Sequence, residues 1–109
     1  MQFPQLNMNG TSGSELLDQL KGALTAIRAA REAVAKTIPH GRDYQTLNVE
    51  AYSTARDEHY ARCRALAAVQ QDLEELAGNV CEQHYARQKR DRQVQLIYAA
   101  DVAEETVVD

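Results

Sequence analysis

Two short polar segments supply the residues of this 109-residue chain that are best suited to bind a ligand. The first, residues 9–14, offers small hydroxyls and close backbone approach directly before a predicted helix, whose free N–H groups attract anions. The second, residues 40–44, combines an imidazole, a guanidinium fork and a phenol ring. We therefore expect a small anionic ligand, bound by Asn9, Thr11, Ser12, His40, Arg42 and Tyr44. A plainer interpretation stays open, in which the first segment only caps a helix and Arg42 pairs with Asp43.

The sequence gives less support to a metal site or to an enzyme active site. His59 with Cys63, and Cys81 with His84, have spacings that place two zinc-binding side chains on one helix face. A helix would separate the two pairs by roughly 27 Å at ~1.5 Å per residue, so we predict no metal and no cofactor. No nucleophile and base form a recognisable arrangement, and the glycines near residue 10 lack the lysine of a phosphate loop, so we do not expect an enzyme.

The charges of the chain are unevenly distributed. Twelve basic and sixteen acidic residues give a net charge of −4, which argues against bulk affinity for nucleic acid or anionic lipid. A short basic block, residues 87–92, precedes an acidic C-terminal segment. Its basic side chains could contact phosphates, but such residues are also typical of the last turns of a helix, so nucleic-acid binding is not predicted.

The first of these segments leads into a predicted helix over residues 14–38. Residues 1–13 show no apolar period and predict a flexible arm, and Ser12 or Ser14 can cap the helix, with Glu15 at the spacing of a capping box. Apolar residues then recur at steps of three and four, interrupted only at Arg31, and Pro39 ends the pattern. The apolar positions are Leu17, Leu20, Leu24, Ile27, Val34 and Ile38.

A second apolar pattern begins at about residue 48 and predicts a helix to residue 77 or beyond. It comprises Tyr52, Ala55, His59, Cys63, Leu66, Val69, Leu73, Leu76 and Val80. Gly78 and Asn79 could terminate it, but we favour continuation to about residue 92, with the glycine costing roughly 1 kcal/mol. Residues 93–102 are partly β-branched and aromatic and fit a short strand, a third helix or an arm.

These elements predict an all-α fold, an antiparallel helical hairpin or small bundle completed by oligomerisation. The expected organisation is an arm over residues 1–13, a helical domain over 14–92, and a C-terminal arm with an acidic tail over 93–109. Two helices leave apolar surface uncovered, so we expect a homo-oligomer, most simply a dimer. Two cysteines and the lack of a long apolar run favour a cytoplasmic protein and exclude a membrane-spanning one.

The order of the segments resembles small helical proteins of bacteriophages and prophages. The resemblance covers about residues 7–80 and includes Asn9-Gly10-Thr11-Ser12, an Ala-rich helix and Pro39-His40-Gly41-Arg42-Asp43-Tyr44. It implies an accessory phage protein in the bacterial host cytoplasm. We expect such a protein to sequester a small anionic ligand, such as a nucleotide signal of host defence, with Thr11, Ser12, Arg42 and Tyr44 meeting across a subunit boundary. The alternatives are an acidic helical inhibitor or adaptor of a host or phage protein, and a role in particle assembly.

Overall fold

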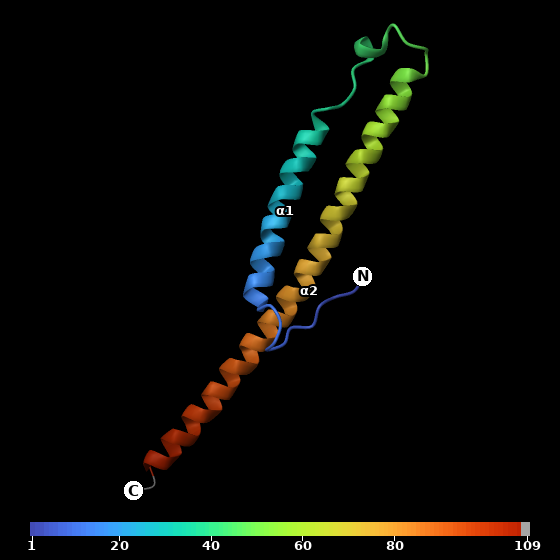
Figure 1. Cartoon of the computed structure of the whole chain (residues 1–109). Helices are drawn as coiled ribbons and strands as arrows, with labels where there is room; N and C mark the ends of the chain where they lie inside the picture. Colours follow the sequence, from blue (N-terminus) through green and yellow to red (C-terminus); the bar gives the residue numbers. More distant parts are fainter. Residues whose placement is uncertain (108–109) are drawn as a thin grey trace.

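The chain folds as a helical hairpin, described by a computed structural model that covers residues 1–107, with side chains to residue 100. Helix α1 spans Gly13–Ala35, a short 3-10 helix η1 spans Gly41–Tyr44, and helix α2 spans Ala51–Val107. The two long helices pack antiparallel, and the described residues contain no strand (Figure 1). The prediction of an all-α antiparallel hairpin is therefore confirmed.

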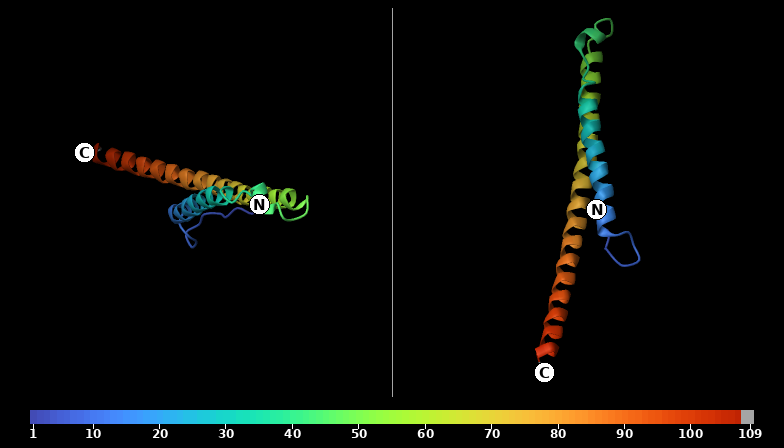
Figure 2. Two further views of the ribbon diagram at one scale, coloured as in Figure 1. Left: turned by 90° about the horizontal axis from the view of Figure 1, so that it is seen from above. Right: turned by 90° about the vertical axis from the view of Figure 1, so that its left-hand side faces the viewer.

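The molecule is a rod because α2 is much longer than α1. Its principal extents are 96 × 23 × 17 Å. The 57 residues of α2 against 23 of α1 leave the C-terminal part of α2 without a helical partner in the chain (Figure 2). So elongated a shape buries little side-chain surface, and the apolar core is correspondingly small.

The core is a single seam between the two helices. Its most deeply buried apolar side chains are Leu20 and Leu24 of α1 and Val80 of α2, which is 0% exposed. His59 is the one buried polar side chain among those described, at 2% exposed. The heptad-like spacing in both helices explains this seam, because positions three and four apart share a helix face.

Helix α1 ends three residues earlier than the apolar pattern predicts. The expected end was residue 38, whereas the helix stops at Ala35. Thr37 bonds back to the carbonyl of Val34 through both its amide, at 3.0 Å, and its hydroxyl, at 2.7 Å. Because Pro39 disfavours the helical region for the residue before it, the chain turns out of the helix here and continues as η1.

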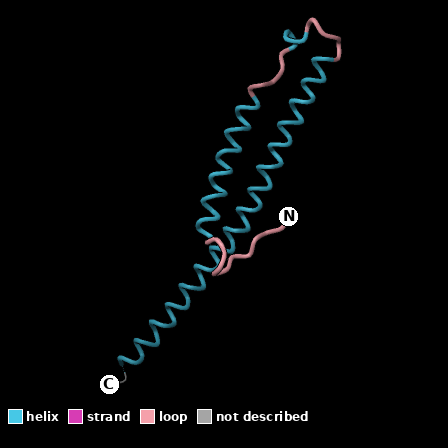
Figure 3. The backbone as a smooth tube through the Cα atoms, viewed as in Figure 1, coloured by secondary structure: helices cyan, strands magenta, loops and turns pink. Residues whose placement is uncertain are grey.

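Helix α2 begins at Ala51, near the expected residue 48, and runs without interruption through Gly78 (Figure 3). Continuation past this glycine is as predicted. The helix also passes Gln93, where the sequence suggested a change of structure, and extends to Val107. Of the three possibilities for residues 93–102, helix is thus the observed one, joined to the preceding helix rather than separate from it.

One position of the predicted α2 seam is wrong. Val69 was expected to face α1, but it is 47% exposed. Gln70 is half-buried at the interface instead and accepts a hydrogen bond of 2.7 Å from the Arg31 guanidinium. Arg31 is the residue that interrupts the apolar pattern of the first helix, so the interruption corresponds to a polar pair across the hairpin.

Candidate functional site

The two predicted ligand-binding segments lie at opposite ends of α1. Residues 9–12 precede its first turn, while residues 40–44 form the tip of the hairpin (Figure 1). The 23 residues of α1 separate them by roughly 35 Å at ~1.5 Å per residue. One chain does not bring these segments together, and a site containing both requires a second chain.

The segment before α1 is held in place by turns and caps. The Asn9 amide donates to the Asn7 side-chain oxygen at 3.0 Å, and the Gly10 amide lies 3.4 Å from the Asn7 carbonyl oxygen. The Ser12 hydroxyl accepts from the Glu15 amide at 3.1 Å, and the Ser12 carbonyl accepts from the Leu16 amide at 3.0 Å. Ser12 is therefore the N-cap, as one of the two predicted candidates.

Two amides at the start of α1 are left without an acceptor among the described residues. The first four N–H groups of an α-helix, counted from the N-cap, have no intrahelical carbonyl to bond, and here they belong to residues 12–15. The Ser12 hydroxyl serves the amide of Glu15, which leaves that of the cap residue itself and, within α1, those of Gly13 and Ser14. These free amides, together with the helix dipole, make the start of α1 favourable for an anion.

Side chains of α2 complete a hollow beside this helix start. The hollow has a volume of about 300 Å³, and its charged or titratable lining side chains are His84, Arg87 and Asp91. Ser12, Gly13 and Gly10 line it from the other side. The helix start, a guanidinium and an imidazole thus line one space, with one carboxylate as the opposing charge.

Gly13 allows α1 to approach α2 at this point. It is buried, and a Cβ atom placed on it would lie 2.6 Å from Nδ1 of His84 and 3.0 Å from its Cβ and Cγ. Any larger residue would push the helix start away from His84. The close approach therefore sets the width of the hollow.

The residues before this segment cross α2 as a short strap. The Leu6 amide donates to the Gln83 side-chain oxygen at 2.9 Å, and the Gln83 side-chain amide donates to the Pro4 carbonyl at 2.8 Å. The region expected to be an arm therefore contacts the long helix. Gln5 and Leu6 of the strap line a hollow together with Arg87 and Arg90 of the basic block.

The tip of the hairpin contains the other predicted ligand-binding residues, residues 40–44. His40 and Arg42 are exposed, and Arg42 makes neither an ion pair nor a side-chain hydrogen bond with any described residue. The Asp43 amide bonds to the His40 carbonyl at 3.0 Å, so the turn is closed by the backbone. Local pairing of Arg42 with Asp43 is therefore not observed, and the guanidinium is available.

Tyr44 contributes to a small aromatic cluster. Its ring centroid lies 6.2 Å from that of Tyr52, and the Arg56 guanidinium lies 5.7 Å from the Tyr52 centroid, at cation–π distance. Tyr44 also lines a shallow hollow of about 440 Å³ together with the carboxylates Glu50 and Glu58. These carboxylates disfavour an anion, so the hollow at the tip is a less favourable anion site than the hollow beside the start of α1.

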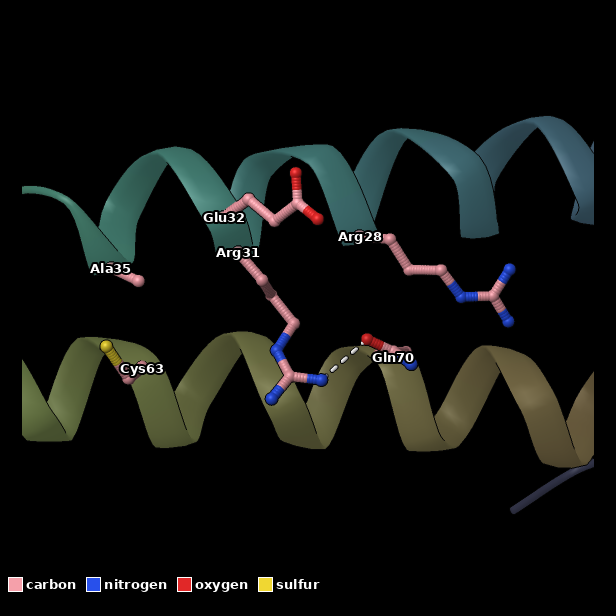
Figure 4. Close-up of a pocket in the computed structure, with 6 residues that line it drawn as sticks. All are labelled: Arg28, Arg31, Glu32, Ala35, Cys63 and Gln70. Carbon is pink, nitrogen blue, oxygen red and sulfur yellow. Dashed lines mark hydrogen bonds between the residues drawn. The ribbon is translucent and has the colours of Figure 1, made fainter.

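A third hollow, of about 450 Å³, lies midway along the seam (Figure 4). Arg31 reaches across it to Gln70, which donates to Glu74 at 2.7 Å, and Glu74 lies 3.8 Å from the Arg28 guanidinium. These contacts connect Arg28, Arg31 and Gln70 within the hairpin, while Glu32, which also lines the hollow, has no ion pair among the described residues. We therefore interpret it as a structural polar network.

The two pairs of possible zinc ligands stay apart, as the helix length predicts. Nε2 of His59 lies 3.6 Å from Sγ of Cys63, while Nδ1 of His59 is buried without a partner. Cys81 is exposed, and His84 packs against Gly13. Within the described part of the chain, no three His, Cys, Asp or Glu residues gather as metal ligands would.

The sequence did not predict that His84 and Arg87 face the start of α1. The predicted helix ends, at residues 38 and 48, centre the turn near residue 43 and would pair residue 13 with a residue close to 73. The observed pairing of Gly13 with His84 corresponds to a centre near residue 48, so the sequence carried no signal for this register.

Comparison with known protein families, with curated proteins and with solved structures finds no match to this chain. The resemblance to phage proteins therefore stays a prediction. In the part of the chain that the structure covers, no helix combines the length and apolarity needed to cross a bilayer.

Proposed function

We propose that the protein is a non-enzymatic binding protein for a small anionic, nucleotide-like ligand, held at the hollow beside the start of α1. The observation that carries this proposal is that the start of α1, at Ser12 and Gly13, lines one hollow of about 300 Å³ together with His84 and Arg87. Backbone amides at a helix start and an arginine fork are the donors that phosphate oxygens favour.

The tip segment contributes to this site only from another chain. Arg42 is exposed and without an ion pair among the described side chains, so it can serve as a second cation for a ligand with two phosphates. Tyr44 would supply an aromatic face for a base. This contribution requires self-association, which the small core and the exposed apolar residues of α2 favour.

The biological setting follows the resemblance in the sequence. An accessory phage protein of this kind would act in the host cytoplasm and lower the free concentration of a nucleotide signal in host defence. Such a role needs tight binding and no turnover, which agrees with the lack of a catalytic arrangement in the sequence.

Calorimetric titration of the full chain with mononucleotides, dinucleotides and cyclic nucleotides tests the proposal. Arg87→Gln should weaken binding about tenfold or more, since a hydrogen bond to a charged group contributes roughly 1.5–3 kcal/mol. Arg64→Gln, on an exposed face of α2 away from the hollow, is the matched control and should bind normally. The absence of binding to every anion at millimolar concentration would refute the proposal.

Arg42→Gln distinguishes a ligand site formed by one chain from a site shared between two chains. Loss of affinity similar to that of Arg87→Gln would place the tip of a second chain at the ligand. Unchanged affinity would limit the site to residues of one hairpin.

An inhibitor or adaptor that binds a host or phage protein is the second candidate. The exposed apolar residues near the C-terminal end of α2, including Val94 and Ile97, favour it, because such a face can pack on a partner helix. A defined protein that co-purifies with the full chain, and that is lost with Ile97→Asp but retained with Arg87→Gln, would support this candidate over the ligand-binding one.

A further inference from the structure

The C-terminal part of α2 lacks a partner helix within the chain. α1 begins opposite His84, and the N-terminal strap reaches no further than Gln93. From there to residue 100 every side chain is exposed. Large apolar side chains are among them, each between 64% and 71% exposed: Val94, Leu96, Ile97 and Tyr98.

This bare surface continues the face of α2 that packs on α1. Val80 and His84 contact that side of the hairpin, and Val94 and Tyr98 follow them at a distance of 14 residues, which is two heptads. Residues two heptads apart lie on nearly the same side of an α-helix. The apolar stripe therefore extends beyond the helix that covers it.

The charges on either side of the stripe have opposite signs. Residues 87–92 carry four basic and one acidic residue, and residues 101–107 carry three acidic and no basic residues. Two copies aligned in parallel would place like charges side by side. Two copies aligned antiparallel place the basic segment of each along the acidic segment of the other, with Val94, Ile97 and Tyr98 between them.

We propose that residues 88–107 of α2 form a self-complementary dimerisation surface that pairs antiparallel with the same segment of a second copy. The midpoint between the basic and the acidic segments sets the two-fold axis near residue 97. Position 90 of one chain then lies alongside position 104 of the other, and position 97 lies alongside its own copy. The overlap is roughly 30 Å long, since helices rise ~1.5 Å per residue.

This inference does not require the nucleotide-like ligand, and the surface that it names is not the contact that would bring Arg42 to the site of a second chain. In such a dimer the two hairpins point away from each other. The tips at residues 40–44 lie at the far ends, so any sharing of Arg42 between chains uses a different contact.

Cysteine crosslinking of the full chain tests the orientation. In a background of Cys63→Ser and Cys81→Ser, Ile97→Cys should form a disulfide-linked dimer readily under mild oxidation. Arg90→Cys should not crosslink to its own copy, because the two cysteines would be roughly 21 Å apart at ~1.5 Å per residue. Efficient crosslinking at both positions, as in a parallel pair, would overturn the proposal.

Light scattering at micromolar concentration tests whether this surface mediates dimerisation. The wild-type chain should have the mass of a dimer, or of a higher oligomer built from dimers. Ile97→Asp should halve that mass, whereas Val69→Asp, an exposed valine on α2 within the hairpin, should leave it unchanged. A monomeric wild-type chain, or an Ile97→Asp variant with unchanged mass, would overturn the proposal.

Reversing the charges of the basic and acidic segments tests whether these segments face each other in the dimer. Lys89→Glu with Arg90→Glu should weaken the homodimer, and mixing this variant with Glu104→Lys, Glu105→Lys should restore pairing as a heterodimer. If the mixture stays as weakly paired as either variant alone, the charges do not face each other and the antiparallel register is wrong. Nucleotide titration of Ile97→Asp reports on the ligand site separately, so failure of one proposal is distinguishable from failure of the other.

Discussion

Replacing Gly13 by alanine gives the sharpest test of how α1 approaches α2. Glycine to alanine at a helix position usually stabilises a protein by about 0.5–1 kcal/mol, because alanine restricts the unfolded chain and favours helix. At Gly13 the new Cβ would lie 2.6 Å from Nδ1 of His84 and 3.0 Å from its Cβ and Cγ. The atoms it meets include the base of the side chain, so rotating the ring does not relieve the clash.

The expected net result is therefore a loss of stability. Forcing a methyl group into a filled space costs typically 1–3 kcal/mol, which exceeds the helix gain. Gly22 of the same helix is the matched control, since a Cβ there meets nothing within 4 Å, and Gly22→Ala should stabilise by about 0.5–1 kcal/mol.

Urea unfolding followed by circular dichroism measures both effects at one protein concentration, which is fixed because self-association shifts apparent stability. Gly13→Ala should regain part of its lost stability in a His84→Ala background, because the contacts with Nδ1 and Cγ are removed while the contact with Cβ stays. If Gly13→Ala stabilises the protein as much as Gly22→Ala does, the close approach of α1 to His84 is wrong.

Three further predictions concern the seam. Val80→Ala, which empties a fully buried site, should destabilise by about 2 kcal/mol in urea unfolding, whereas Val69→Ala should stay within about 0.5 kcal/mol. His59→Leu should be neutral or stabilise by about 1 kcal/mol, because it removes a buried ring nitrogen that has no partner; a loss above about 2 kcal/mol would show that the nitrogen is satisfied. The double change Arg31→Leu with Gln70→Leu should be neutral or stabilising when measured by thermal unfolding, since both members of the hydrogen bond are replaced by apolar groups.

The sequence determines the helices of this protein because their signals are local. The apolar spacing specifies two helices, Ser12 supplies the cap, and Pro39 forces the turn between them. The end of α1 was predicted three residues too late, since Ile38 fits the apolar pattern although the following proline removes it from the helix.

Local signals were weaker along the second helix. Gly78 and the β-branched residues after Gln93 argue against helix by propensity, yet the helix continues through both. A single glycine costs only about 1 kcal/mol, which the helical neighbours on each side offset. The acidic and basic segments around residue 97 were visible in the sequence, but their common axis became apparent only once α2 was continuous.

The tertiary structure decides which residues meet, because that depends on the register of the two helices. Ser12 and Arg42 were both chosen from the sequence for their chemistry, and one hairpin keeps them at opposite ends of α1. His84 and Arg87 come to the start of α1 instead, from a part of the chain about 70 residues away. Composition and spacing identify groups that can bind an anion, whereas only packing shows which of them face the same space.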